Sequence, residues 1–196
     1  MSDTAQRQVT TRPAAPSVGA EVARSRRIRL RELSYGDIAW LSRLYAQPQM
    51  QHLLLDDSPT RFFEVAALVA WVKQVYDQRR GLGIWRADAI DGDFLGTFSL
   101  MPVDATGEVQ IGARLTTEAW GHWYAMEGGR LLCRQAFAVL GLPSVVAYFH
   151  PDHEVVAHLL ERLGFRDTAA CLYAGKPARR FELQAADWGA ARITRA

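Results

Sequence analysis

Cysteine is scarce in this sequence, and long hydrophobic runs are absent. The two cysteines, Cys133 and Cys171, are too few for a disulfide framework and lack metal-site spacing. We therefore predict no metal site and a reducing, cytoplasmic location. No apolar run approaches the roughly 18 residues of a membrane span, because Lys73 and Gln74 interrupt the longest candidate, residues 65–76. The amino-terminal residues lack the apolar core of a secretory signal, so we expect no membrane association.

Strong net charge is also missing, and the small positive excess is unevenly placed. The whole chain has a formal net charge of +2. Residues 1–30 hold six arginines against Asp3 and Glu21, which leaves a net charge of −2 on the remainder. The rest of the chain therefore offers no electrostatic case for binding nucleic acid.

Residues 1–25 differ in composition from the rest of the chain. They are rich in Thr, Ala, Ser, Pro and Gln and poor in apolar residues, so we predict a flexible extension. The arginines there also suit an organelle presequence, although Asp3, Glu21 and the prolines are atypical of one. The length of 196 residues and the hydrophobic content of 49% predict one domain over residues 26–196.

Hydrophobic periodicity predicts strands and helices along this domain. An Asp91-Gly92 pair between two apolar runs indicates a hairpin. The order of elements predicts an α/β (α+β) fold, a mixed central sheet of about six to seven strands flanked by about four helices. We expect strands near residues 28–33, 84–89, 94–101, 108–115, 145–149, 165–173 and 179–183, and helices near residues 37–45, 65–76, 122–140 and 153–163.

The most informative stretch is Trp120-Gly121-His122-Trp123-Tyr124-Ala125-Met126-Glu127. It follows the strand near residues 108–115 and opens the helix near residues 122–140. A strand, a glycine turn and a helix amino terminus bring free backbone N–H groups and the positive end of the helix dipole together, where a phosphate can bind. The alternative interpretation is a plain helix start with packed tryptophans, because short glycine motifs also occur by chance.

These features resemble the GNAT superfamily of acyl-CoA-dependent N-acetyltransferases, and most of all the branch that acetylates ribosomal-protein amino termini. The glycine turn matches the phosphate-loop motif of that branch, and a later Leu163-Gly164-Phe165 is in register with it. Trp123 departs from the pattern, which has Gly or Ala there. The resemblance implies acetyl-CoA as the acyl donor and direct transfer to a primary amine. It implies donor-binding roles for Gly121, His122, Trp123, Tyr124 and Ala125, with Arg130 or Arg134 meeting phosphate charge. It also implies that backbone N–H groups around Gly112–Leu115 polarise the thioester carbonyl.

The resemblance defines the acid and the base less sharply. Where the branch has Glu-Ile-Gly in the strand before the turn, this chain has Gln110-Ile111-Gly112, and an amide takes up no proton at neutral pH. Gln110 can still orient a water or the substrate. Glu108 is the nearest carboxylate on the same strand face and is the candidate general base, or else a solvated charge beside a turn. His153 stands where the branch has Asn and is the candidate general acid, or else a polar neighbour of the helix start. Tyr148 and Tyr173 are further candidate proton donors.

Two functions fit these observations. The first is an N-acetyltransferase that transfers an acetyl group from acetyl-CoA to a protein amino terminus or a small-molecule amine. The second is a GNAT-fold protein without catalysis that binds acyl-CoA or a protein partner, which the departures at Gln110, Trp123, His153 and Val156 favour. Many GNAT proteins pair, so the resemblance also implies a homodimer.

Overall fold

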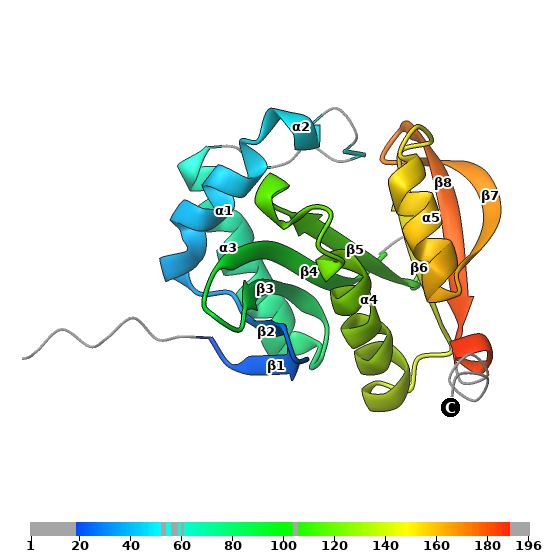
Figure 1. Ribbon diagram of the computed structural model, residues 1–196, viewed down its shortest axis with the longest axis horizontal. Coiled ribbons are helices and arrows are strands. Elements are labelled where there is room, and N and C mark those ends of the chain that lie inside the picture. The colour runs from blue at the N-terminus through cyan, green and yellow to red at the C-terminus, as the bar shows by residue number, and fades with distance from the viewer. Residues whose placement is uncertain (1–18, 52–53, 56–58, 60, 104–105, 189–196) are drawn as a thin grey trace, which may run out of the picture.

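A mixed sheet with strand order β1-β2-β3-β4-β5-β6-β8-β7 forms the centre of the protein (Figure 1). The computed structural model describes residues 19–51, 54–55, 59, 61–103 and 106–188. The strands are β1 (Glu21–Arg24), β2 (Ile28–Glu32), β3 (Gly83–Ala89), β4 (Phe94–Pro102), β5 (Val109–Leu115), β6 (Ser144–Phe149), β7 (Arg166–Tyr173) and β8 (Lys176–Gln184). The α-helices in the described residues are α1 (Ile38–Tyr45), α2 (Pro48–Gln51), α3 (Phe62–Gln78), α4 (Tyr124–Arg134) and α5 (Glu154–Leu163).

The predicted mixed α/β fold is confirmed, with one more strand and one more helix than expected. The extra strand, β1, pairs with β2 through Glu21–Arg31 and Arg24–Arg29. The prediction of a flexible extension over residues 1–25 is therefore wrong for Glu21–Arg24, and its residues 1–18 lie outside the described part of the chain. Four residues are the shortest stretch in which alternation is recognisable, so β1 has no clear signal in the sequence.

Different helices cover the two faces of the sheet. On β2, Leu30 belongs to the core cluster that includes residues of α4 and α5, while the next residue, Arg31, contacts Asp37 at the start of α1. A second cluster joins α1 and α3 through Leu41 and Val69. Because neighbouring strand residues point to opposite faces, α4 and α5 lie on one face and α1 and α3 on the other.

The sheet is joined between β5 and β6 at a single register pair, Gln110–Val146. These two strands are parallel. On its other side, β5 is paired with β4 along the whole length of β5, from Gly96–Leu115 to Pro102–Val109. Figure 1 shows the two halves of the sheet spreading apart from this junction. Within the described residues, the edge of β5 that faces β6 therefore has no strand partner from Ile111 to Leu115.

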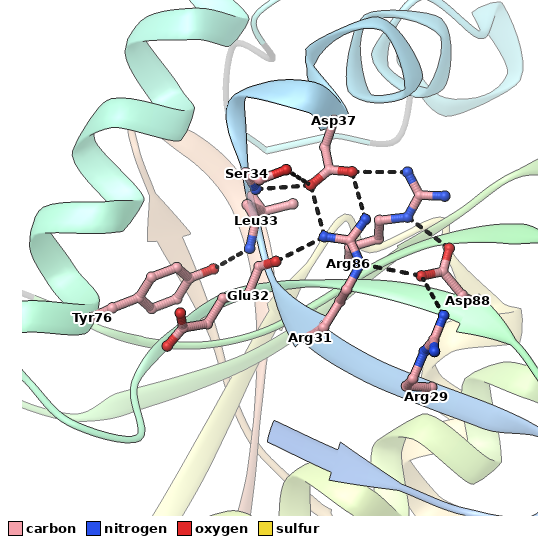
Figure 2. Close-up of polar contacts among 9 residues, drawn as sticks. All are labelled: Arg29, Arg31, Glu32, Leu33, Ser34, Asp37, Tyr76, Arg86 and Asp88. Atoms are coloured by element: carbon pink, nitrogen blue, oxygen red, sulfur yellow. Dashed lines mark hydrogen bonds and ion pairs between the residues drawn. The ribbon is translucent and has the colours of Figure 1, made fainter. Parts of the chain in front are cut away.

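A network of buried charges fixes the start of α1 to β2 and β3 (Figure 2). Arg31 donates two hydrogen bonds to the Asp37 carboxylate, at 2.9 and 2.7 Å, and Arg86 donates to the same group at 2.9 Å. Arg86 also donates to Asp88 at 2.6 Å. Asp37 and Asp88 are each only 2% exposed. Charges this deeply buried are tolerated when they are paired and hydrogen-bonded, so the network holds α1 in one position against the sheet.

Candidate active site

The segment between β5 and α4 ends in a tight turn at residues 121–123, called the phosphate turn because the sequence predicts phosphate binding there. Two of its three residues have left-handed backbone conformations. Gly121 has φ 77° and Trp123 has φ 66°, whereas His122 between them is not among the described residues with positive φ. Side chains other than glycine rarely adopt this left-handed region, which costs roughly 1–2 kcal/mol. Trp123 thus takes a conformation that suits glycine, one of the two residues that the GNAT pattern has in its place.

The N–H groups of this turn are free of backbone acceptors. Glu127 donates to the Trp123 carbonyl at 3.1 Å, but none of the residues from Gly121 to Ala125 donates to a backbone carbonyl of the described chain. The first N–H groups of a helix have no partner within the helix. Where right-handed and left-handed backbone conformations alternate, successive N–H groups point into one concavity that can bind an anion. The structure therefore brings the expected donors Gly121, His122, Trp123, Tyr124 and Ala125 together at the amino terminus of α4.

The Trp123 side chain lies on the α5 side of the turn. Its ring is covered by the guanidinium of Arg162, whose carbon is 4.8 Å from the ring centroid. The residue is still 58% exposed. A cation over an exposed aromatic ring is worth about 0.5–1 kcal/mol, which partly offsets the strain of the left-handed backbone.

A basic depression of about 620 Å³ adjoins the turn. Arg27 donates to Glu127 at 2.7 Å and to the His122 carbonyl at 3.1 Å, so it ties the β1–β2 connection to the head of α4. Burial alone raises the pKa of Glu127, but hydrogen bonds from Ser25 and Arg27 outweigh it and lower that pKa. Four arginines against one glutamate leave the depression suited to anions. It is lined by Ser25, Arg26, Arg27, Trp123, Met126, Glu127, Arg130 and Arg162.

Leu115 stands at the end of the open β5 edge, next to the turn. Its carbonyl accepts a hydrogen bond from the Trp120 indole N–H at 3.1 Å. The turn and the open edge are therefore continuous, since Trp120 links the last residue of β5 to the segment that leads into α4.

Glu108, the predicted base, lies at the other end of β5 in a hydrogen-bonded cluster. Its carboxylate accepts hydrogen bonds from Arg180, from Tyr148 at 3.0 Å and from Thr106 at 2.8 Å. Burial alone raises the pKa of Glu108, but the hydrogen bonds, first that of Arg180, outweigh it and lower the pKa below its ordinary value. A carboxylate stabilised in its charged form is a weaker base.

Gln110 stands at the junction of β5 and β6, on the face that points away from α4. Its side-chain oxygen accepts a hydrogen bond from the Tyr173 hydroxyl at 2.8 Å. The Tyr173 ring stacks on the ring of Tyr148, with 4.7 Å between centroids and 29° between planes. Two tyrosines thus connect the β6–β8–β7 half of the sheet to Glu108 and Gln110, where backbone pairing is sparse.

His153 is the N-cap residue of α5, just beyond the carboxyl end of β6. Because β5 and β6 are parallel, the carboxyl ends of both strands lie at the same edge of the sheet. His153 is therefore on the side of the phosphate turn, whereas Glu108 precedes the amino end of β5. The structure places the predicted acid and the predicted base at opposite ends of the strand pair.

Sequence reasoning missed Arg27, Arg162 and Arg180. Each is exposed or half-buried and lies far along the chain from its partner, Glu127, Trp123 or Glu108. An isolated arginine carries no sequence signal for such a contact, so only the fold reveals these pairs.

Neither a metal cluster nor a membrane span emerges from the part of the chain that the structure describes. No group of three or more His, Cys, Asp or Glu residues is arranged there to hold an ion. None of its helices combines the length and the hydrophobicity required to cross a bilayer.

Comparison with curated proteins gives a relative in Aspergillus fumigatus, FsC-acetyl coenzyme A-N(2)-transacetylase. The two are 27% identical over 128 residues, which are 61% of this chain and 54% of the relative. The chain thus spans about half the length of this curated relative.

Comparison with solved structures gives the same fold in several acetyltransferases. Spermidine N-acetyltransferase from Vibrio cholerae, in complex with CoA and spermine, has a TM-score of 0.69 at 15% identity, covering 82% of this chain and 97% of that one. An acetyltransferase from Agrobacterium tumefaciens has a TM-score of 0.71 at 21% identity, covering 83% of this chain and 93% of that one. Identities this low establish the shared fold alone.

The family profile described as an acetyltransferase (GNAT) domain matches residues 27–166, which include the phosphate turn, β5 and α5 up to Leu163. Because this match covers well over half of the sequence, the chain belongs to the GNAT acetyltransferase family.

Proposed function

We propose that the protein is an acyl-CoA-dependent N-acetyltransferase that transfers an acetyl group from acetyl-CoA directly to a primary amine. One observation carries the proposal: the cluster of free N–H groups at the head of α4 continues into the unpaired edge of β5. The first feature suits a pyrophosphate. The second suits an extended amide-bearing arm, which can hydrogen-bond to a strand edge as another strand would.

Acetyl-CoA spans these two features in the proposed complex. The pyrophosphate binds the N–H groups of residues 121–125, and the basic depression with Arg130 and Arg162 attracts the remaining phosphate charge. The pantetheine arm runs along β5 from Leu115 to Ile111, about 13 Å at the usual rise per strand residue. The thioester then arrives where β5 and β6 separate, beside Gln110. Holding the acyl group there supplies the proximity that lowers the barrier to transfer.

A neutral amine attacks the thioester carbon in this proposal, without a carboxylate base. Glu108 is not the base in this proposal, because its carboxylate already accepts hydrogen bonds from Arg180 and Tyr148. The attacking nitrogen loses its proton to solvent, and the leaving thiolate takes one up. His153 stays a prediction as the general acid, and its place at the phosphate-turn end of β6 argues for contact with the arm instead of the thioester.

The acceptor in the proposal is a primary amine, on a small molecule or at a protein amino terminus. The Vibrio cholerae neighbour contains spermine and the Aspergillus fumigatus relative is an N(2)-transacetylase, which together support a small-molecule amine. The ribosomal-protein branch expected from the sequence finds no support among these proteins. A homodimer and a cytoplasmic location remain part of the proposal and rest on the family resemblance and cysteine usage.

The experiment that tests the proposal is calorimetric titration with acetyl-CoA and with CoA, followed by a free-thiol assay over a panel of amines. We expect micromolar binding of both ligands, and thiol release that depends on the amine. The panel should contain spermidine, an amino acid and a short peptide with a free amino terminus. Absence of binding at millimolar acetyl-CoA would refute the proposal.

The alternative, a GNAT-fold protein that binds acyl-CoA without turnover, is favoured by one specific observation. The carboxylate of Glu108, two residues before the junction on β5, is neutralised by Arg180, and the residue at the junction is an amide. Binding of acetyl-CoA without thiol release from any amine in the panel would select this alternative.

A further inference from the structure

The Gln110 amide is held in one orientation at the junction of β5 and β6. Its side-chain oxygen accepts a hydrogen bond from the Tyr173 hydroxyl, with 2.8 Å between the two oxygens. The amide is planar and carries its two donors on the nitrogen, so fixing the oxygen also fixes the direction of the N–H groups. Among the described residues, no side chain or carbonyl accepts a hydrogen bond from this nitrogen.

Tyr173 is itself fixed, by its ring and by its backbone. The ring stacks on Tyr148, whose hydroxyl is held by Glu108 at 3.0 Å. The next residue, Ala174, has φ 49°, the only positive φ besides Trp123 among the described non-glycine residues. A strained backbone of this kind persists where the surrounding structure requires it. The tight β7–β8 turn therefore presents the Tyr173 hydroxyl to Gln110.

From this geometry we propose that Gln110 donates a hydrogen bond to the acyl oxygen during transfer, with Tyr173 as the positioning residue that orients the amide. The inference rests on the proposed function and adds a side-chain role to it. The amine nitrogen forms a bond to the thioester carbon, and the carbonyl electron pair moves onto the oxygen, which accepts the Gln110 N–H. The C=O bond then re-forms, the C–S bond breaks, the nitrogen loses a proton to solvent and the thiolate gains one.

A donor role differs in kind from the base role of a carboxylate at this position. An ionised glutamate can accept hydrogen bonds but has none to donate, so it would repel the negative charge that develops on the oxygen. The glutamine donates to that charge and has no proton-accepting role at neutral pH. The substitution Gln110→Glu therefore has opposite consequences under the two mechanisms.

The kinetic test compares Gln110→Glu, Gln110→Met and Tyr173→Phe. Tyr35→Phe is the control, because it removes a tyrosine hydroxyl at an exposed residue that has no part in the site. Both Gln110 variants should lower kcat for thiol release by about 10²-fold, while the KM for acetyl-CoA stays within about 3-fold. Tyr173→Phe should lower kcat by about 10-fold, because the amide is kept but misoriented. Tyr35→Phe should stay within about 2-fold of the wild type.

A spectroscopic test needs bound acetyl-CoA but no acceptor. The carbonyl stretch of acetyl-CoA labelled with ¹³C at the carbonyl carbon should lie at lower frequency on the wild type than on Gln110→Met, because a hydrogen bond weakens the C=O bond. Equal frequencies would overturn this inference alone, and so would undiminished kcat in Gln110→Glu or an equal loss in Tyr35→Phe. Failure of the wild type to bind acetyl-CoA would overturn the proposed function and this inference together.

Discussion

The guanidinium of Arg162, on α5, covers the indole ring of Trp123, the N-cap residue of α4, with 4.8 Å between the guanidinium carbon and the ring centroid. This contact joins the two helices that follow the diverging strands β5 and β6. It also draws the bulky ring toward α5, at a residue whose backbone has φ 66°. A tryptophan is thereby accommodated in a turn whose shape suits glycine.

Replacing Trp123 should separate backbone strain from ring packing. Trp123→Gly removes a left-handed strain of roughly 1–2 kcal/mol and a cation–π contact of about 0.5–1 kcal/mol. Its free energy of unfolding should therefore rise by between about 0 and about 1.5 kcal/mol. Trp123→Ala keeps most of the strain and loses the contact, so it should be the less stable variant. Urea unfolding of both variants measures the difference. An alanine variant as stable as the glycine variant would contradict this account of the turn.

Gly121 should be required for acetyl-CoA binding because its positive φ orients the turn. Gly121→Val adds a β-branched side chain at φ 77°, with no heavy atom within 4 Å of its Cβ, so any effect comes from the backbone. We expect at least a 10-fold loss of acetyl-CoA affinity, about 1.4 kcal/mol, in calorimetric titration. Gly141→Val is the matched control, since Gly141 has φ 65° and equally open surroundings away from the turn. Equal losses of affinity in both variants would indicate general destabilisation.

Glu108 should contribute to stability and little to turnover. The pKa of its carboxyl is lowered in the folded protein, because hydrogen bonds led by that of Arg180 outweigh burial. A lowered pKa gives a contribution that is present above the ordinary value of 4.5 and is lost as the pH falls below it. Glu108→Gln should therefore be less stable than the wild type at pH 7, and the gap should narrow as the pH falls below that value. Chemical denaturation across this pH range is the measurement.

The same variant tests the base role in the thiol-release assay. We expect kcat/KM of Glu108→Gln within about 3-fold of the wild type, since a general base contributes about 10²–10⁴-fold. A loss in that larger range would restore Glu108 as the base.

The buried network around Asp37 should be worth far more than a surface ion pair. Asp37→Asn leaves Arg31 and Arg86 buried without their shared charge, so we expect a loss of about 3 kcal/mol in the free energy of unfolding. Glu21→Gln breaks the exposed Glu21–Arg24 pair, at 3.8 Å, and should cost less than about 0.5 kcal/mol. Hydrogen bonds from Arg31 and Ser34 outweigh burial and lower the pKa of Asp37, so the effect of Asp37→Asn should shrink below its ordinary pKa of 3.8. Comparable losses in the two variants at pH 7 would contradict the burial argument.

Much of the fold was predictable because it depends on local periodicity. Alternation over residues 109–115 and helical spacing over residues 154–163 each reflect one buried face, and both elements are found within a few residues of the expected bounds. The phosphate turn was predictable for a similar reason, since a strand, a glycine and a helix start lie next to one another in the chain. β1 escaped prediction because a four-residue edge strand depends on its pairing with β2.

The candidate site was predictable only where its groups belong to the backbone. The N–H groups of residues 121–125 follow from local structure, so the sequence alone located them. Apart from Thr106, which is two residues from Glu108, the side-chain partners of Glu108 and Gln110 lie 40–72 residues away in the chain, in β6, β7 and β8. No sequence pattern encodes a contact between single polar residues at such separations.

The sequence by itself thus determined the α/β architecture, the turn at the head of α4 and the GNAT family. Only the tertiary structure decided that Arg180 neutralises Glu108, that Tyr173 orients Gln110, and that His153 and Glu108 lie at opposite ends of the β5–β6 pair. The physical reason is that hydrophobic patterning and turn conformation act over a few neighbouring residues. The charge state and orientation of a side chain, in contrast, depend on whichever groups the packed sheet brings within hydrogen-bonding distance.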